Sequence, residues 1–216
     1  METKEPKTQP IGQGAAQHEE GKKVNRKLIT GIAVAVVAVV VIALGWYFIN
    51  QSGANAADEA IGKADIEQND SVALELYKEA ATMGHKSGNR AKLMVAINLY
   101  QDGKYQEALE YLEDASIDDE VIAAGAYSLT GDCYVNLEKY DEALNAYSKA
   151  LNKAEGNSMV APLILIKRAN IFRAQQNYAA EFEAYDAIVN QYPEFLRASQ
   201  FDVRKYRERA RVAAGK

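Results

Sequence analysis

The sequence contains few of the residues from which catalytic and metal-binding sites are usually built. Its 216 residues include one cysteine, Cys133, so no intramolecular disulfide can form. Histidine occurs only at His18 and His85, and there is no glycine-rich phosphate loop, Cys/His ligand set or nucleophile–base pattern. We therefore predict that the chain is not an enzyme, with no catalytic, cofactor-binding or metal-binding residue and no small-molecule substrate.

Clustered acidic residues offer the nearest alternative, because a pair of carboxylates can perform general acid–base catalysis. The clusters at 118–120 and 141–142 both fall where a helix is expected to begin. Carboxylates at a helix N-terminus are stabilised by the helix dipole, so we interpret both clusters as capping residues. Cys133 lies within a predicted helix and is interpreted as a small core residue.

Positive charge is scarce in the central part of the chain. Residues 51–195 carry 12 basic and 24 acidic side chains, a net charge of −12, whereas residues 1–27 carry +2 and residues 196–216 carry +5. A nucleic-acid partner needs a basic surface that contacts phosphates. The acidic central part therefore argues against nucleic acid as a partner.

Residues 28–50 form a long apolar stretch without charge. As a helix, its 22 residues from Leu28 to Ile49 are about 33 Å long, which is enough to cross a hydrocarbon core of about 30 Å. Four cations precede it and the first charge after it is Asp58, a bias that keeps the N-terminus in the cytoplasm. Trp46 and Tyr47 near its end are typical of a membrane interface. We predict a single transmembrane signal anchor that contacts the lipid bilayer.

Two other interpretations of this stretch are possible. A buried core helix is less consistent with the uninterrupted apolar length and the one-sided charge. A cleavable signal peptide is a stronger alternative, because residues 54–56 (Ala-Asn-Ala) have the small-x-small form of a cleavage site. The apolar stretch is nevertheless longer than the usual apolar region of about 7–15 residues.

Residues 1–27 are polar, contain two prolines and show no apolar periodicity. Such a segment cannot bury enough apolar surface to fold. We predict a disordered cytoplasmic tail; a receptor-binding tail is the alternative.

After residue 50 the sequence repeats with a period of about 35 residues. ALELYKEA at 73–80 recurs as ALEYLEDA at 108–115 and ALNAYSKA at 143–150, with a distant copy, AEFEAYDAI, at 180–188. This pattern indicates pairs of short amphipathic helices. The pairs must stack, because one pair cannot bury its apolar face alone.

The repeating unit resembles the tetratricopeptide repeat. The copy at 124–157 has suitable residues at the signature spacings, namely Tyr127, Gly131, Tyr134, Leu137, Tyr140, Ala143, Tyr147 and Ala150. Copies at 89–122 and 162–195 fit less completely, and the copy at 54–87 is degenerate. The resemblance implies an all-α solenoid of about four helix pairs over residues 51–195.

Within each unit, a small alanine allows the two helices to approach, and a tyrosine closes the turn between them. Gly103 marks one such turn, and Asn177 is expected to adopt a comparable conformation in another. The side chain four residues after the alanine, such as Tyr147, is expected to pack towards the next unit. In the last copy Glu181 replaces the small residue, so we expect that helix pair to be splayed.

Residues 196–216 are predicted to form one basic helix that caps the stack, because a solenoid needs a polar-backed terminal element. Leu196, Phe201, Val203 and Tyr206 are expected to cover the last repeat while five arginines face outward. The alternative is a basic helix that lies on an anionic membrane surface.

The resemblance also implies a groove, because the first helix of each pair lines the concave, protein-binding face in this fold. The predicted lining residues are Arg90, Leu93, Met94, Ile97, Tyr100, Leu129, Asp132, Val135, Asn136, Leu163, Ile166, Lys167, Asn170 and Arg173. The family's clamp for a peptide carboxylate needs Lys and Asn where Asp132 and Ile166 stand. We instead expect an apolar groove with polar edges that binds an amphipathic helix or an unfolded segment. The alternative is that the chain's own terminal helices fill part of it.

The complete layout resembles the ancillary subunit of the bacterial Sec translocon, in the form found in Bacteroidota. The segments GDCYVNLEKYDEALNAYSKAL (131–151) and YPEF (192–195) carry this resemblance. It implies a single-pass inner-membrane protein with its C-terminal domain in the periplasm. The implied partners are Sec channel subunits, a membrane-anchored chaperone of the peptidyl-prolyl isomerase class and exported client proteins.

Two other functions remain open at this point. A scaffold or assembly subunit of another cell-envelope machine, in secretion, motility or cell-wall synthesis, has the same fold and topology. A secreted solenoid with a cleaved leader would have no membrane role.

Overall fold

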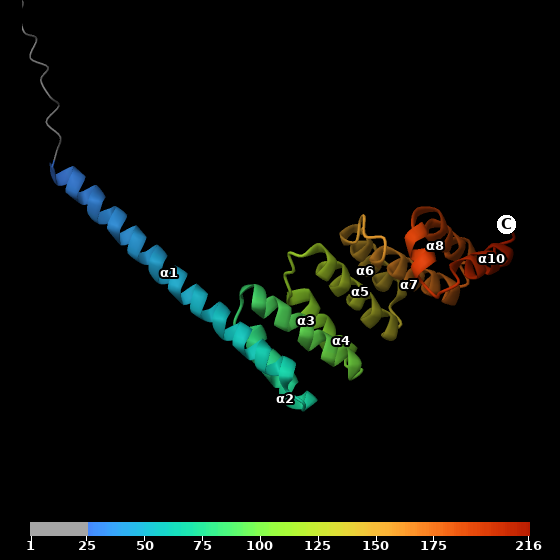
Figure 1. The fold of residues 1–216 in the computed structure, drawn as a ribbon, viewed down its shortest axis with the longest axis horizontal. Coiled ribbons are helices and arrows are strands. Elements are labelled where there is room, and N and C mark those ends of the chain that lie inside the picture. The colour runs from blue at the N-terminus through green and yellow to red at the C-terminus, as the bar shows by residue number, and fades with distance from the viewer. Residues whose placement is uncertain (1–25) are drawn as a thin grey trace, which may run out of the picture. The chain divides into compact units, whose positions relative to one another are not determined.

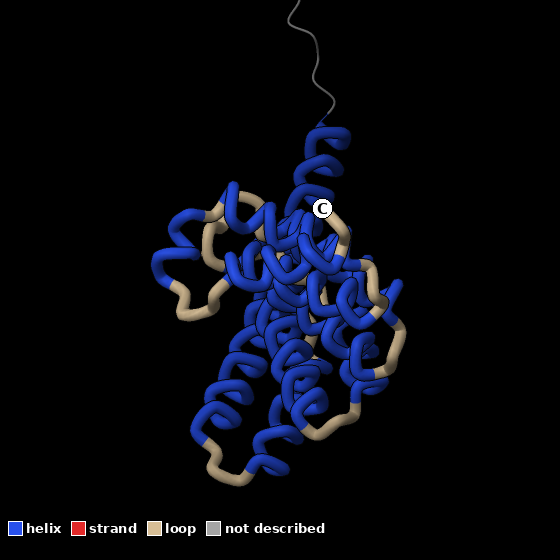
Figure 2. Tube along the Cα trace, turned by 90° about the vertical axis from the view of Figure 1, so that its right-hand side faces the viewer, coloured by secondary structure: helices blue, strands red, loops and turns tan. Residues whose placement is uncertain are grey.

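The computed structural model describes residues 26–216, and every regular element in that range is a helix (Figures 1 and 2). Side chains are described from Ala35 onward. The predicted all-α class, built on tetratricopeptide-like repeats, is confirmed. The predicted disordered tail lies outside the described residues, except for its last two, which begin helix α1.

Helix α1 (Arg26–Ile66) is a single helix of 41 residues. The chain divides into two compact units, 1–47 and 48–216, and α1 runs through that division. In the first unit, the large apolar side chains from Val36 to Tyr47 are 49–71% exposed. Within the described residues, the segment Ala35–Ile66 is long and apolar enough to cross a membrane, and an 18-residue window in it has a mean hydropathy of 1.8.

The predicted anchor and the first repeat are parts of one helix. The predicted anchor ends at residue 50, but α1 continues to Ile66. Five alanines between residues 51 and 66 explain the continuation, because alanine has the highest helix propensity. In the second unit, Ala60, Ile61 and Ala64 on this part of α1 are buried in the core of the first repeats. The degenerate first unit therefore takes its first helix from the end of α1.

The remaining helices follow one another as pairs joined by short turns (Figure 1). Each of α2 to α8 packs against the next, and both α9 and α10 pack on α8. The helices are α2 (Asp70–Thr82), α3 (His85–Gln101), α4 (Tyr105–Asp114), α5 (Glu120–Asn136), α6 (Tyr140–Lys153), α7 (Val160–Ala174), α8 (Tyr178–Gln191), α9 (Pro193–Ala198) and α10 (Val203–Ala213).

The turns inside the pairs share one geometry. The second helix of a pair begins at a tyrosine in three units: Tyr105, Tyr140 and Tyr178. Two residues before each tyrosine the backbone is left-handed, with φ of 77° at Gly103, 59° at Glu138 and 58° at Gln176. The expectation for Asn177 is therefore wrong by one residue. Asn177 has φ −84° and caps α8, its side chain accepting a hydrogen bond from the Ala180 N–H at 3.2 Å.

The closest approach within a pair is between α5 and α6. A Cβ atom at Gly131 would lie 2.4 Å from Cε1 of Tyr147, so only glycine fits there. Tyr147 was expected to pack towards the next unit, and it does share a core with Ile164 and Ile171 of α7. Its nearest contact, however, is within its own pair.

The C-terminal region differs from the single predicted helix. It forms α9 and α10, because Pro193 begins one helix and Asp202 caps the other by accepting a hydrogen bond from the Lys205 N–H at 3.1 Å. The aromatic rings of Phe201 and Tyr206 stack with centroids 4.6 Å apart.

Two of the five arginines do not face outward as expected. Arg207 pairs with Asp186 at 3.3 Å, and Arg209 pairs with Glu181 at 2.5 Å, both acids lying on α8. The carboxylate of Glu181 is buried, and the guanidinium of Arg209 compensates its charge. The expected splaying of the last pair is not seen, because Ala169 on α7 and Tyr185 on α8 are both fully buried.

Candidate protein-binding groove

The first helices of the pairs form one continuous face. Helix α5 packs against both α3 and α7, whereas the second helices α4, α6 and α8 pack less closely on one another. The first helices therefore lie on the inner side of the stack, which is the concave side in a solenoid. We refer to the surface of α3, α5 and α7 on this side as the groove.

Most of the predicted apolar lining residues form the wall of the groove. Leu93, Met94, Tyr100 and Leu129 are half-buried and pack against the core formed by α1 to α5. Val135 and Ile166 pack in the same way against the two later cores, and Ile97 is also half-buried. Leu163 alone in this apolar set is mostly exposed, at 51%. A binding partner would therefore find less free apolar surface than the sequence suggests.

A polar network lies in the middle of the groove, centred on Asp132 of α5. The Tyr147 hydroxyl donates to Oδ1 of Asp132 at 2.6 Å. The Lys167 ammonium donates to Oδ2 of Asp132 at 2.5 Å and to Ser128 Oγ at 3.0 Å. Each carboxylate oxygen of Asp132 therefore accepts one hydrogen bond, and the Lys167 ammonium balances its charge.

Burial makes the two groove tyrosines weaker acids than a free tyrosine. The pKa of Tyr147 lies far above its usual range, first because the hydroxyl is buried and then because it donates to the Asp132 carboxylate. Burial likewise raises the pKa of Tyr100, and the nearby negative charge of Asp132 adds to the effect. Both hydroxyls stay protonated at neutral pH; that of Tyr147 donates to Asp132, and that of Tyr100 accepts from Asn136.

A cavity of about 290 Å³ lies beside the polar network. It brings together four predicted residues: Asp132, Val135, Lys167 and Asn170. Its other lining residues are not among those predicted for the groove: Tyr140, Tyr147, Ile171 and Ala174. The repeat pattern predicts a packed aromatic ring at Tyr147, four positions after Ala143. It does not predict the hydrogen bond from the Tyr147 hydroxyl to Asp132.

Other predicted residues lie away from this cavity. Arg90 is exposed and pairs with Asp65 of α1 at 3.5 Å. Asn136 donates a hydrogen bond to the Tyr100 hydroxyl at 3.4 Å, which links α5 to α3. Arg173 is exposed near the end of α7. Leu93, Met94 and Ile97 on α3 do not line the cavity either.

The described residues contain no cluster that could bind a metal ion on this face. No three His, Cys, Asp or Glu side chains in the described part of the chain are placed to hold a metal ion. Cys133 is buried, and burial raises the pKa of its thiol to about 11. A thiol that remains protonated at neutral pH is a poor nucleophile.

The C-terminal helices pack at the last pair of the array. Helices α9 and α10 pack on α8, which is a second helix of a pair. Phe195 of α9 and Val203 of α10 also share a core cluster with Ala169 of α7, and the groove residue Ile166 packs against this cluster.

Comparison with known proteins identifies the family. Residues 56–173, more than half of the chain, match the family described as "Tetratricopeptide repeat-like domain", and the chain belongs to this family. Among solved structures it is similar to the crystal structure of MamA protein, with a TM-score of 0.51 and 17% sequence identity over 77% of this chain and 88% of that chain. At that identity the likeness shows the fold alone. No curated protein sequence matches the chain. Repeat folds of this kind present extended binding surfaces, and this one indicates a protein-binding scaffold.

Proposed function

We propose that this protein is a membrane-tethered, non-enzymatic scaffold whose groove binds a partner polypeptide. The observation that carries the proposal is the combination, in one chain, of an exposed apolar helix and a tetratricopeptide-like repeat array. The exposed Leu163 and the cavity beside Lys167 and Asn170 give the groove one apolar and one polar contact region.

We further propose that the protein is an ancillary subunit of the bacterial Sec translocon. Its anchor would occupy residues 28–50, with the N-terminus in the cytoplasm and the repeats of residues 51–195 and the basic C-terminal region in the periplasm. The four cations before the apolar stretch support this topology. The partners would be Sec channel subunits, a membrane-anchored isomerase-type chaperone and exported clients.

Tethering would supply the mechanism. An anchor confines the groove to the membrane surface, and this raises its effective concentration for any partner that is also held there. A weak groove is then sufficient, because the second binding event becomes intramolecular. Weak binding is consistent with the small amount of exposed apolar surface in the groove.

Purification of the full-length protein from its native membrane in mild detergent tests the assignment. We expect Sec channel subunits and a membrane-anchored isomerase to be identified by mass spectrometry of the purified complex. Recovery of a different envelope complex would keep the scaffold function and replace the Sec assignment. An intact mass that lacks the first 56 residues would show a cleaved leader and overturn the tether.

The groove itself is tested by Leu163→Glu combined with Asn170→Glu. Both side chains are exposed, so the change alters the binding surface without breaking a core. Substitutions at Leu129 or Ile166 would test folding instead, because those residues pack against cores. We expect at least a fivefold loss of co-purified partner. Val72→Glu is the matched control, because Val72 is 46% exposed on α2, away from the groove. Equal recovery with both variants would show that the groove assignment is wrong.

A further inference from the structure

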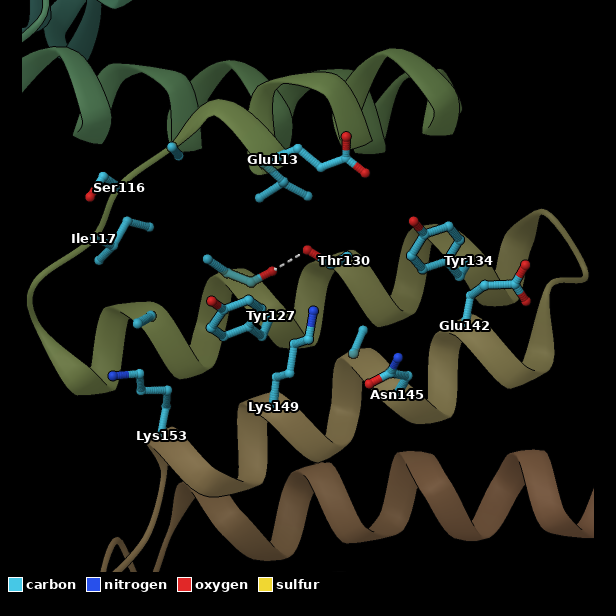
Figure 3. Close-up of a pocket in the computed structure, with 15 residues that line it drawn as sticks. Glu113, Ser116, Ile117, Tyr127, Thr130, Tyr134, Glu142, Asn145, Lys149 and Lys153 are labelled. Atoms are coloured by element: carbon cyan, nitrogen blue, oxygen red, sulfur yellow. Dashed lines mark hydrogen bonds between the residues drawn. The ribbon is translucent and has the colours of Figure 1, made fainter.

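A second and larger cavity lies on the opposite face of α5 (Figure 3). It has a volume of about 570 Å³ and is formed by α4, α5, α6 and the segment between α4 and α5. On α5 it is lined by Tyr127, Thr130 and Tyr134. These three side chains lie on one face of the helix, and the groove residues of α5 lie on another. Its volume is in the range of about 300–1,000 Å³ that is typical of ligand-binding sites.

The cavity exists because α4 is one turn shorter than α6. With a repeat of 35 residues, the end of α4 at Asp114 corresponds to Lys149, but α6 continues to Lys153. The last two residues of α4 are acidic (Glu113 and Asp114), and the helix dipole disfavours negative charge at a helix C-terminus. Asp119 then caps α5 by accepting from the Ile122 N–H at 2.9 Å, so the chain between the two helices is not helical.

Hydrogen bonds to α3 hold this connecting segment away from α6. The Ser116 N–H donates to the Asn89 side chain at 3.1 Å. The Lys92 ammonium donates to the Asp114 carbonyl at 3.1 Å and pairs with its carboxylate at 2.6 Å. The open side of the cavity is therefore built by specific contacts.

The two ends of the cavity carry opposite charge. Helix α6 contributes Glu142 at one end and Lys149 and Lys153 towards the other (Figure 3). The rise of the helix separates residues 142 and 153 by about 16 Å. Glu113 of α4 and Glu142 of α6 lie on different sides of Tyr134 at this end (Figure 3), and after burial both carboxylates raise the pKa of Tyr134. None of these four charged residues forms an ion pair within the described part of the chain.

Leu112, Ala126 and Ala146 give the cavity an apolar floor, beside the polar Thr130 and Asn145 (Figure 3). Ile117 of the connecting segment lies at the end that holds Lys153. The ring of Tyr127 is 37% exposed, and the Lys149 ammonium lies 5.9 Å from its centroid. The cavity thus has an acidic end, a small-residue apolar floor and a basic end in one line.

We propose that this cavity is a second binding site, for a short segment of a partner protein with a matching charge order. A basic side chain of the segment pairs with Glu113 and Glu142, an apolar side chain covers Ala126 and Ala146, and an acidic side chain pairs with Lys149 and Lys153. Charge complementarity identifies a polypeptide as the occupant. A nucleic acid presents phosphates along its whole length, and the two carboxylates would repel it.

Peptide binding to the full-length protein in detergent tests the site. The probe is a fluorescent octapeptide with two lysines, a central Phe-Leu pair and two aspartates, and its binding is followed by anisotropy. We expect Lys149→Glu combined with Lys153→Glu to weaken binding at least tenfold. The same double variant should gain affinity for a second octapeptide in which lysines replace the aspartates.

Three further variants make the test specific. Arg204→Glu with Lys205→Glu makes the same charge change on exposed residues of α10 and should leave binding unchanged. Asn145→Trp fills the cavity without changing its charges and should abolish binding, with an unchanged circular dichroism spectrum. The Leu163→Glu variant should bind the octapeptide normally, since the proposal does not depend on the groove. No binding of the first octapeptide, or equal loss in the cavity and α10 variants, would overturn it.

Discussion

At the scale of single residues, the packing of α5 on α6 depends on the absence of one side chain. Gly131 occupies a position where the other units have a small residue, such as Ala96 and Ala169, both fully buried. In this unit even a methyl group is too large, because the buried ring of Tyr147 occupies the space. The ring cannot move away without breaking its hydrogen bond to Asp132.

Gly131→Ala should therefore destabilise the protein although alanine favours helices. Overpacking is expected to lower the free energy of unfolding by about 1–3 kcal/mol. Gly125→Ala is the matched control on the same helix, because nothing lies within 4 Å of a Cβ atom there. That variant should gain about 0.5–1 kcal/mol from the lower backbone entropy of the unfolded chain. Urea unfolding followed by circular dichroism measures the free energy of unfolding of both variants. Equal changes in the two variants would contradict the close approach of Tyr147 to residue 131.

At the scale of elements, the turns inside the pairs are not equally relaxed. Gly103 adopts the left-handed conformation without strain, whereas Glu138 and Gln176 adopt it with a Cβ atom that crowds the backbone. The two non-glycine turns are held in this conformation by the helices on either side. At Glu138, for example, the Lys139 N–H after it donates to the Tyr134 carbonyl at 2.9 Å.

Glu138→Gly should stabilise the protein for this reason. We expect the free energy of unfolding to rise by about 1 kcal/mol, since the left-handed conformation costs a non-glycine residue about 1–2 kcal/mol. Glu138→Asn should give a smaller gain, because asparagine tolerates this conformation better than glutamate. Lys139→Gly, at the next position with φ −91°, has no strain to relieve and should not stabilise. A gain in the Lys139 variant as large as that of Glu138→Gly would show that the strain is not the cause.

The repeating elements could be predicted from the sequence, and the non-repeating ones could not. Tyrosines at a spacing of 35 and 38 residues locate the start of three second helices. The continuation of α1, the early end of α4 and the break between α9 and α10 have no counterpart in other units, so alignment of the repeats does not reveal them. The first follows from the helix propensity of its alanines, and the other two follow from local capping, as at Asp119 and Asp202.

The candidate site was predictable as a set of positions but not as a set of contacts. The repeat register places Asp132 and Lys167 on first helices of neighbouring units. Their pairing depends on how far one unit is rotated against the next, and the sequence does not specify this rotation. The larger cavity was missed because it depends on a missing helical turn in α4.

At the scale of the whole molecule, the core of the repeat array is divided into three clusters along the stack. Each cluster joins neighbouring units, as expected when every repeat contacts only the next one. The last cluster is closed by α10, which supplies Val203 and Ala210 as buried residues and Arg209 as the partner of Glu181. The ion pair is therefore the charged part of the end cap.

Arg209→Ala should weaken the C-terminal part of the array strongly. The change leaves the Glu181 carboxylate buried without a counter-charge, which costs about 3–5 kcal/mol for a buried pair and less here because Arg209 is partly exposed. Arg211→Ala, on the exposed face of α10, should change stability by less than about 0.5 kcal/mol. The double variant Glu181→Ala with Arg209→Ala should recover most of the loss. Thermal unfolding distinguishes these outcomes, and no recovery would show that Arg209 acts through packing alone.

Glu181 also determines where the array can grow. Repeat arrays lengthen by duplication of a unit, and a duplicated unit must fit the surface that its new neighbour presents. The earlier units have alanine at the corresponding position, so a copy inserted among them meets no special requirement. A copy inserted after α8 would displace α10 and would have to supply an arginine for the buried carboxylate. Lengthening of this array by duplication is therefore favoured in its interior and disfavoured at its C-terminal end.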